Sequence, residues 1–335
     1  MVATLSTVIQ NNSLDQRCID DNRQETSMHL GCVAILVCTF NGERFLAQQL
    51  ESIARQSYPH WFVVVSDDGS SDSTMALLHE FGARWGHEKL SIQRGPGHGY
   101  AANFLAVTCD ESIRADFYAW ADQDDVWQEK KLEVALLRLA QTPADVPALY
   151  CGRTELIDER GEHIGFSPLL SRPLGFANAL VESIGGGNTM VFNHVARQLF
   201  QRAGGVVDIV SHDWWAYLLV SGSGGRVLYD FSPTVLYRQH EANLIGATSS
   251  LHKQFGRLRR VLQGRFRGWN QKNVVALESI RLLLNEENRT RLDLFQRARH
   301  SRGLARMMWL RRSGVYRQSL GGNLGLIIAT LFNGI

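Results

Sequence analysis

The chain has 335 residues, of which 44% are hydrophobic and 20% are charged, a balance that excludes a fibrous or largely disordered protein. The formal net charge of +2 hides an asymmetry. Residues 1–252 carry 18 Lys and Arg against 29 Asp and Glu, whereas residues 253–335 carry 17 against 4. We therefore expect the basic segment to face an anionic surface: a membrane, a nucleic acid or the acidic body of the protein itself.

The two ends of the chain and its cysteines bear on location. Residues 1–30 are polar and lack the apolar block of a signal peptide, so a loosely ordered lead-in is expected there. The five cysteines form no CxxC pair, which predicts reduced thiols in the cytoplasm rather than a zinc site or a disulfide framework. The apolar tail at 324–332 is too short to span a bilayer. These features predict a soluble or peripheral protein.

Short apolar strands alternate with helices along the first half of the chain. The predicted elements are strands at 33–38, 61–65, 90–92 and 117–121, with helices at 44–56, 74–85, 101–113 and 130–141. Such alternation predicts right-handed βαβ units and an α/β fold with an open, mostly parallel (mixed) sheet flanked by helices. Ligands of such sheets bind outside the carboxyl ends of the strands.

Polar residues gather directly after three of these strands. The richest cluster places Asp122, Asp124 and Asp125 within four positions after an apolar run, and like charges this close repel unless a cation or protons offset them. Such a set of oxygen ligands suits Mg²⁺ or Mn²⁺ bound together with substrate phosphates. An acidic N-cap for a helix beginning near Val126 is the alternative, but it explains one aspartate and not three.

The other two clusters are Thr39–Glu43 and Asp67–Asp72. Adjacent carboxylates such as Asp67 and Asp68 can accept hydrogen bonds from a nucleobase N–H and from ribose hydroxyls, although the same stretch also fits a plain βα turn. The glycine-rich stretch 95–99 is a weak match to a dinucleotide fingerprint. We expect a flexible loop there that lets backbone approach a ligand, with Asn103 pointing back toward it.

Three later stretches carry chemistry-bearing residues. The glycines at 185–187 indicate either close packing against substrate or a floppy loop. Asp213 opens a helix between His212 and two tryptophans, so it is either an N-cap or a general base beside a sugar, whose CH groups pack on aromatic faces. His240 follows a strand and is either structural or a neutral ligand that completes a metal shell.

Beyond residue 246 the chain becomes arginine-rich and helical. Helices are predicted at 251–262, 273–285 and 290–300, followed by 304–312. The last stretch mixes aromatic, aliphatic and basic residues, as helices lying in the plane of a membrane do. The alternative is a helix that docks its apolar face on the rest of the protein. No nucleic-acid-binding motif is recognisable in this segment, so a nucleic-acid partner is not expected.

With these residues assembled, the chain resembles bacterial family 2 glycosyltransferases of the GT-A fold, particularly the rhamnosyltransferase-like branch. The resemblance covers residues 33–246 and extends to the basic C-terminal segment. Its motifs are Thr39-Phe40-Asn41-Gly42, Asp67-Asp68-Gly69-Ser70-Ser71-Asp72, Ala121-Asp122-Gln123-Asp124-Asp125-Val126-Trp127, Gly187-Asn188-Thr189, His212-Asp213-Trp214-Trp215 and Tyr237-Arg238-Gln239-His240.

The resemblance implies an inverting transfer from a nucleotide-diphosphate sugar that depends on Mg²⁺ or Mn²⁺. Asp213 matches the catalytic base, and the metal would be held by Asp124, Asp125 and His240, with the choice between the two aspartates left open. His212 is not assigned as a base. The residues expected to bind the nucleotide-sugar are Thr39, Asn41, Glu43, Asp67, Asp68, Asn103, Asp122, Gln123, Asn188, Trp214 and Arg238.

The expected function is transfer of L-rhamnose from dTDP-rhamnose to a hydroxyl of a lipid-linked or glycan acceptor in cell-surface polysaccharide biosynthesis. The alternatives are a UDP- or GDP-sugar donor, or a non-catalytic nucleotide-sugar-binding protein. The expected organisation is a lead-in at 1–30, a GT-A domain at 31–247 and a basic helical region at 248–335. We expect a cytoplasmic protein, peripheral at the inner face of the cell membrane, with contact through 253–335; a homodimer stays open.

Overall fold

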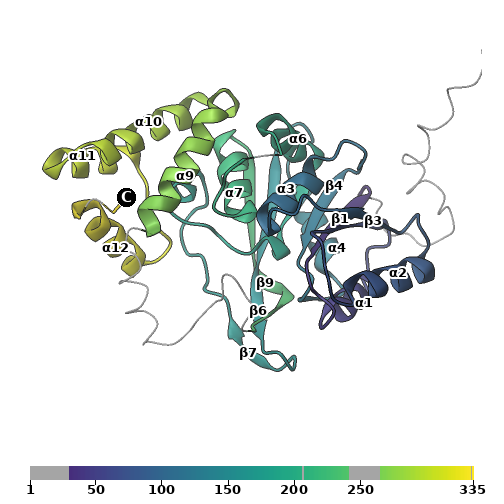
Figure 1. Cartoon of the computed structure of the whole chain (residues 1–335). Coiled ribbons are helices and arrows are strands. Elements are labelled where there is room, and N and C mark those ends of the chain that lie inside the picture. The colour runs from purple at the N-terminus through teal and green to yellow at the C-terminus, as the bar shows by residue number, and fades with distance from the viewer. Residues whose placement is uncertain (1–29, 206, 241–264, 333) are drawn as a thin grey trace, which may run out of the picture.

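The computed structural model describes residues 30–205, 207–240, 265–332 and 334–335. The helix predicted at 251–262 and the lead-in, apart from Leu30, lie outside these residues. Among the described residues, nine strands form one sheet with helices on both faces, and a helical group lies at the C-terminal end of the molecule (Figure 1).

Four parallel strands make the half of the sheet that carries the three polar clusters. In their order across the sheet they are β3 (Leu90–Arg94), β2 (Trp61–Asp67), β1 (Val33–Thr39) and β4 (Phe117–Ala121). Every residue of β1 and β2 is buried, as expected of Val- and Ile-rich strands covered on both faces.

The other half of the sheet is mixed. β8 (Val191–Asn193) is antiparallel to both β4 and β6 (Ala148–Ile157), and β9 (Arg226–Arg238) runs parallel to β6. β5 (Val126–Trp127) pairs antiparallel with β9, and β7 (His163–Phe166) forms a hairpin with β6. Because only residues 122–125 separate β4 from β5, the acidic loop is pinned beside the end of β9.

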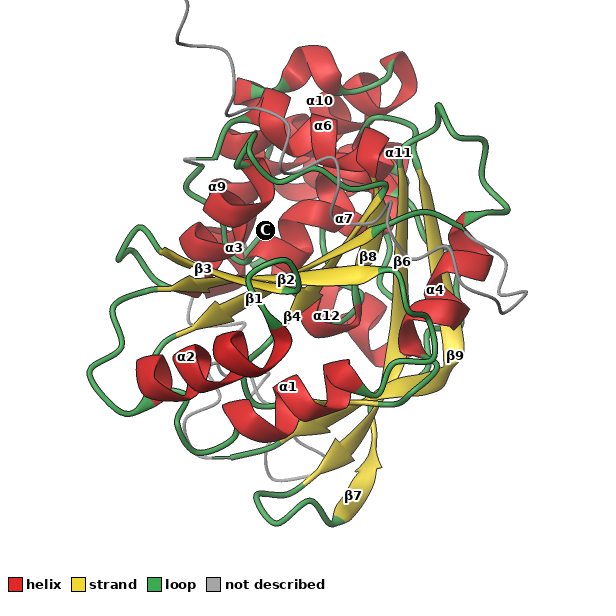
Figure 2. Ribbon diagram, turned by 90° about the vertical axis from the view of Figure 1, so that its right-hand side faces the viewer, coloured by secondary structure: helices red, strands yellow, loops and turns green. Residues whose placement is uncertain are grey.

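Helices cover the two faces of the sheet (Figure 2). On one face lie α1 (Leu46–Ala54), α2 (Thr74–Trp85) and α4 (Lys131–Leu139); on the other lie α3 (Tyr100–Cys109), α6 (His194–Ala203) and α7 (His212–Gly222). The outer helices dock through apolar stripes, whereas α7 is buried on nearly all sides. In α1, Leu46, Leu50 and Ile53 recur at helical spacing and are fully buried, which stabilises the fold by roughly 1.5–3 kcal/mol per side chain. The short turns α5 (Phe176–Ala179) and η1 (Gly187–Thr189) precede β8.

The C-terminal helices are α9 (Arg265–Ser279), α10 (Glu286–His300), α11 (Gly303–Ser313) and α12 (Leu320–Leu331), with the turn η2 (Arg281–Leu283) after α9. Leu277, Phe295 and Leu326 belong to the same hydrophobic cluster as Trp215 of α7. The core of the sheet therefore continues into these helices. The division at residue 247 stays a prediction.

The expected α/β fold with a mixed, partly parallel sheet and C-terminal helices is confirmed. Several elements differ from their predicted bounds; the helix predicted at 273–285, for example, is α9, which ends at Ser279. α3 ends at Cys109 and not near residue 113, because Asp110 is extended and its side chain accepts hydrogen bonds from Ser112. The last strand, β9, begins as early as Arg226, because its first residues pair with Ala148 and its neighbours on β6.

The cysteine prediction is wrong at one position. Cys38, Cys109 and Cys151 are free thiols, whereas Cys32 is disulfide-bonded. As for the membrane, none of the described helices is long and apolar enough to cross a bilayer.

Candidate functional site

The three polar clusters meet because their strands are parallel neighbours. Thr39 at the end of β1 lies in register with Asp67 at the end of β2, and Val37 pairs with Ala121, so Asp122 follows at the same edge. The structure therefore brings together the stretches that the sequence placed at strand ends.

Thr39 and Asp67 join the first two clusters. The Thr39 hydroxyl donates to the Asp67 carboxylate at 2.7 Å, and the same carboxylate accepts from the Ser70 hydroxyl at 2.6 Å and the Ser70 amide at 2.8 Å. Burial by itself would raise the pKa of Asp67, but the hydrogen bonds from Ser70 and Thr39 outweigh it and lower the pKa. Asp67 is thus an ionised, well-held acceptor.

Asn41 and Glu43 reach across to the second cluster. Asn41 adopts a left-handed conformation, with φ of 49°, and its side-chain oxygen accepts from the Ser71 amide at 2.8 Å. Glu43 accepts from the Ser73 amide at 2.9 Å, at the start of α2. In this structure both side chains hold the loop before α2, so the contact with a nucleoside stays a prediction.

Asp68 fixes the glycine-rich loop. Its two carboxylate oxygens accept from the amides of Gly97 at 2.7 Å and Gly99 at 2.8 Å. The Asn103 side chain lies against Gly95, where an added Cβ would come within 2.7 Å of its oxygen. Asn103 is buried, however, and exchanges hydrogen bonds with the Ser66 side chain and carbonyl. It therefore ties α3 to β2 and supports the loop from behind.

Gln123 presents the exposed ring of Phe40. Its side-chain amide accepts from the Phe40 amide at 2.9 Å and donates to the Phe40 carbonyl at 3.0 Å. Phe40 is 57% exposed beside these polar loops, unlike the buried aromatic residues of the core. A Cβ at Gly42 would lie 2.4 Å from Gln123, so glycine is required for this contact. The pair puts an open aromatic face at the rim of the site.

Asp124 and His240 form the part of the site that fits a divalent cation. Their side chains share a hydrogen bond of 2.7 Å between Oδ2 and Nε2, and both are partly exposed, at 20% and 13%. Neighbouring ligands on an octahedral Mg²⁺ or Mn²⁺ lie about 3.0 Å apart, so the two atoms fit adjacent positions. No cluster of three metal-ligating side chains exists among the described residues. A cation here would need further oxygens from substrate and water.

Asp125 does not share that position, and the expectation that it is a metal ligand does not fit its surroundings. The side chain is fully buried. One oxygen accepts from the Asn188 amide group at 2.5 Å and the other from the Arg238 amide at 3.1 Å. Burial first, then the neighbouring Asp124 and Asp122, raise its pKa. Asp125 and Asn188 therefore hold the loop from inside the protein.

Lys131 lies behind Asp125. It is fully buried, and its ammonium makes no hydrogen bond to a described residue; it lies 3.9 Å from the centroid of the Trp127 ring. Burial lowers the pKa of Lys131 to about 7, which the nearby Asp125 partly opposes. The Lys131 side chain therefore interacts with the Trp127 ring through a cation–π contact and with the charge of Asp125.

Arg238 was expected to contact the nucleotide-sugar, but its guanidinium is buried and directed inward. It donates to the carbonyls of Asp124 at 3.0 Å, Asp158 at 3.2 Å and Glu159 at 3.2 Å, and to the Gln48 side chain at 2.7 Å. The guanidinium also lies over the Phe45 ring at 4.5 Å. Arg238 therefore joins the acidic loop, the β6–β7 hairpin and α1.

Asp213 lies at the start of α7 and faces the acidic cluster. One oxygen accepts from the Ser211 hydroxyl and, at 2.6 Å, from the Trp214 amide. No hydrogen bond from a described residue reaches the other oxygen. Burial raises the pKa of Asp213, which increases its affinity for a proton. Burial, Asp124 and Asp213 together raise the pKa of Asp122 to about 8, so these three carboxylates share one site.

Two tyrosines complete the site and were missed as site residues. Burial, then Asp213 and Asp122, raise the pKa of Tyr100 to about 12. Burial raises the pKa of Tyr237, and so do four nearby carboxylates, those of Asp122, Asp125, Asp124 and Asp213. Both hydroxyls are therefore protonated donors at neutral pH. Tyr237 and Arg238 are neighbours on β9, and neighbouring side chains of a strand point to opposite faces. This alternation is the sequence signal that could have identified Tyr237 once Arg238 was known to point inward.

Trp214 and His212 lie in the core. The indole of Trp214 donates to the Ala179 carbonyl at 2.7 Å and is buried, so the expected packing on a sugar does not fit. His212 stacks on Phe104 with centroids 4.1 Å apart, and burial lowers its pKa to about 3. A Cβ at Gly187 would lie 2.1 Å from His212 Nε2, so that glycine is packed against the α7 histidine.

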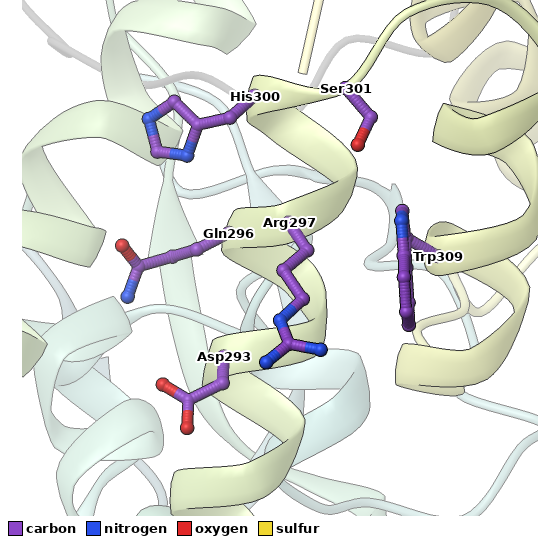
Figure 3. A pocket seen from close by; sticks show the side chains of 6 residues that line it. All are labelled: Asp293, Gln296, Arg297, His300, Ser301 and Trp309. Atoms are coloured by element: carbon purple, nitrogen blue, oxygen red, sulfur yellow. The ribbon is translucent and has the colours of Figure 1, made fainter.

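A separate pocket of about 540 Å³ lies between α10 and α11 (Figure 3). Its lining residues are Asp293, Gln296, Arg297, His300, Ser301 and Trp309. The one carboxylate among them, on Asp293, is paired with Arg281 at 2.8 Å. This pocket therefore lacks the acidic groups that converge at the strand ends.

Comparisons with known proteins agree with this geometry. Residues 34–186 match the family model "Glycosyl transferase family 2". The chain is similar to the dTDP-rhamnosyl transferase RfbG of Shigella flexneri, 28% identical over 66% of this chain and 78% of that protein. It is also similar to the Escherichia coli glucosyltransferase WfgD, named as transferring from UDP-Glc to α-D-GlcNAc-diphosphoundecaprenol, at 30% identity over 31% of this chain and 39% of that protein.

Among solved structures, the chain is similar to S. aureus TarS 1–349, with a TM-score of 0.54 and 14% identity over 90% of this chain and 79% of that chain. At that identity the likeness concerns the fold, and it agrees with the expected GT-A architecture. The family model covers the ends of β1, β2 and β4, whereas Asp213 and His240 lie beyond the matched residues. Residues 34–186 are therefore similar to glycosyl transferase family 2.

Proposed function

We propose that this protein transfers L-rhamnose from dTDP-rhamnose, with inversion, to a hydroxyl of a lipid-linked or glycan acceptor during cell-surface polysaccharide synthesis. The single observation that carries the chemistry is that Asp122, which follows β4, lies near both Asp124 and Asp213, the aspartate at the start of α7. Rhamnose is the choice of donor because RfbG, which is similar over 66% of this chain and 78% of its own length, is named a dTDP-rhamnosyl transferase.

The nucleotide would lie across the ends of β1 and β2. Asp67 and Asp68 are acceptors for base N–H and ribose hydroxyl groups, and the exposed Phe40 ring offers a face for the base to stack on. The diphosphate would then lie toward Asp124 and His240. A bound Mg²⁺ or Mn²⁺ supplies positive charge that stabilises the departing diphosphate.

Asp213 has the properties of the base. Its free oxygen would accept the proton of the acceptor hydroxyl while that oxygen forms its bond to the anomeric carbon. The bond from this carbon to the diphosphate oxygen breaks, and the electron pair leaves with dTDP. The raised pKa favours proton uptake, and the Ser211 and Trp214 hydrogen bonds fix the carboxylate in position. The Tyr100 hydroxyl, which is near Asp213 and Asp122, would donate to a sugar or phosphate oxygen.

The test has two stages. Thermal shift with Mn²⁺ and a panel of dTDP-rhamnose, UDP-glucose, UDP-GlcNAc and GDP-mannose should give the largest rise in Tm with dTDP-rhamnose, because a bound donor stabilises the folded state. Turnover is then measured as dTDP release in the presence of a lipid extract from the source cell envelope. A larger rise in Tm with a UDP- or GDP-sugar would mean that this sugar, and not dTDP-rhamnose, is the donor. Donor binding without any turnover would favour a non-catalytic binding protein.

A further inference from the structure

The helix α12 exposes an apolar stripe. Leu320, Leu324, Ile327 and Leu331 recur at intervals of four, three and four residues, so they lie on one face, and all are exposed. No charged residue occurs anywhere in α12. Exposed leucines on a protein surface usually lie singly among polar residues. A continuous stripe at helical spacing therefore indicates a surface that is in contact with lipid or with another apolar surface.

The C-terminal sequence that contains α12 is basic, although Glu182 lies beside it and pairs with Arg317 at 3.0 Å. Residues 294–335 contain seven arginines and no Asp or Glu. Three of these, Arg302, Arg311 and Arg312, are exposed on or beside α11, the helix that packs against α12. α11 and α12 lie at the end of the molecule away from α1 and α2 (Figure 1). The stripe and the arginines thus share one end of the protein.

Trp309 adds an interfacial aromatic residue. Arg297 and Arg312 lie over its ring at 5.3 and 5.1 Å, and Figure 3 shows Arg297 of α10 extending toward that ring. Tryptophan with arginine is the side-chain combination found at the boundary between lipid headgroups and acyl chains. The uncharged stripe of α12 suits contact with acyl chains, and the neighbouring tryptophan and arginines suit contact with lipid headgroups.

We infer that α12 inserts its stripe of Leu320, Leu324, Ile327 and Leu331 into the surface of an anionic bilayer, with the arginines of α11 contacting the lipid phosphates. A second copy of the chain is the less favourable occupant, because pairing two such ends would bring arginines of the same sign together. The inference does not depend on the identity of the sugar donor.

The experiment is co-sedimentation of the full chain with vesicles of phosphatidylcholine alone or with phosphatidylglycerol. Wild type should bind the anionic vesicles more tightly, and added salt should weaken that binding. The double variant Leu324→Asp/Ile327→Asp should lose about a hundred-fold or more in affinity for both vesicles. Arg311→Gln/Arg312→Gln should lose about twenty-fold on anionic vesicles and little on neutral ones.

Leu137→Asp, at an exposed leucine of α4, is the matched control and should bind as wild type does. Thermal unfolding of each variant checks that it is folded. Failure of folded wild type to bind anionic vesicles, or wild-type binding by the Leu324→Asp/Ile327→Asp variant, would overturn the inference. So would a dimer of the wild type in light scattering that this variant converts to a monomer without vesicle binding; the face would then be an interface between two copies.

Discussion

The strand ends of the sheet and the C-terminal helices carry opposite charges under opposite constraints. At the strand ends, Asp67, Asp68 and Asp125 accept hydrogen bonds from named donors, so their positions are fixed by the loops around them. On and beside α11, Arg302, Arg311 and Arg312 are exposed. Fixed carboxylates suit recognition of one small ligand in one orientation, whereas exposed arginines suit a broad anionic surface of no fixed shape.

Each region also contains a buried arginine that donates to backbone carbonyls. Arg238 joins the loops of the acidic site, and Arg306 links α11 to α12 through the carbonyls of Ser301 at 2.8 Å and Thr330 at 3.0 Å. The same chemistry therefore supports a ligand site in one region and a surface helix in the other. Variants that separate these two uses test the comparison.

The largest expected effect is on turnover. Asp213→Asn should lower kcat by about 10²- to 10⁴-fold, because the amide cannot accept the acceptor's proton, while donor affinity changes by less than about three-fold. Dissociation constants for donor and initial rates of dTDP release measure the two quantities. Asp208→Asn, at an exposed aspartate shortly before α7, is the control and should keep both values. Ordinary turnover by Asp213→Asn would remove the base assignment.

The next largest effects are expected from substitution of the two buried arginines, Arg238 and Arg306, which should impair different functions. Arg238→Lys should reduce the free energy of unfolding by about 3–5 kcal/mol and abolish donor binding, because a lysine cannot satisfy four acceptors in a fork. Arg306→Lys should cost about 1–3 kcal/mol and weaken vesicle binding while donor affinity stays at the wild-type value. Denaturant unfolding, donor titration and vesicle sedimentation measure these three quantities. Equal loss of donor binding in both variants would contradict the separation.

Substitution of the adjacent residues Asp124 and Asp125 should affect different properties, metal binding in the first case and stability in the second. Asp124→Asn should raise the Mn²⁺ concentration needed for half-maximal donor binding by about ten-fold or more, because the cation loses a carboxylate. Asp125→Asn should instead lower the free energy of unfolding by about 1–3 kcal/mol, since its amide group would face the Asn188 or Arg238 donor. Metal titration followed by thermal unfolding tells them apart. A stronger Mn²⁺ defect in Asp125→Asn would restore Asp125 as the ligand.

The smallest effect concerns pH. Burial lowers the pKa of His212 from 6.5 to about 3. Between these values the unfolded chain binds a proton that the folded chain does not, so stability falls as pH falls, by up to about 1.4 kcal/mol per pH unit. His212→Leu should flatten the slope of unfolding free energy between pH 6 and 4 by up to about that amount. His87→Leu, at an exposed histidine, should keep the wild-type slope.

Much of this architecture follows from local pattern. α2 has its predicted bounds, Thr74 to Trp85, because its apolar spacing and the start signal after Asp72 agree. The strand-end clusters also met as predicted, since parallel strands align their carboxyl ends. These features depend on residues close together in the sequence or on a general rule of sheet geometry.

The direction of individual side chains did not follow from the motif. Asp125, Trp214 and Arg238 lie in motifs that form the site, yet all three are buried and bonded inside the protein. A motif places the backbone at the site, but a one-residue step along a strand or helix turns the side chain to the opposite side. Tyr237 was missed for the same reason, because it is the neighbour that faces the carboxylates.

The arrangement around Arg238 has a consequence for fluctuations. One guanidinium closes hydrogen bonds to the acidic loop, the hairpin near Asp158 and the α1 residue Gln48, so none of these segments can open without disturbing the others. Local opening should therefore be shared between them. In native-state hydrogen exchange, the protected amides of these segments should exchange with one common opening free energy, and a bound nucleotide-sugar should slow all of them together, including those it does not touch.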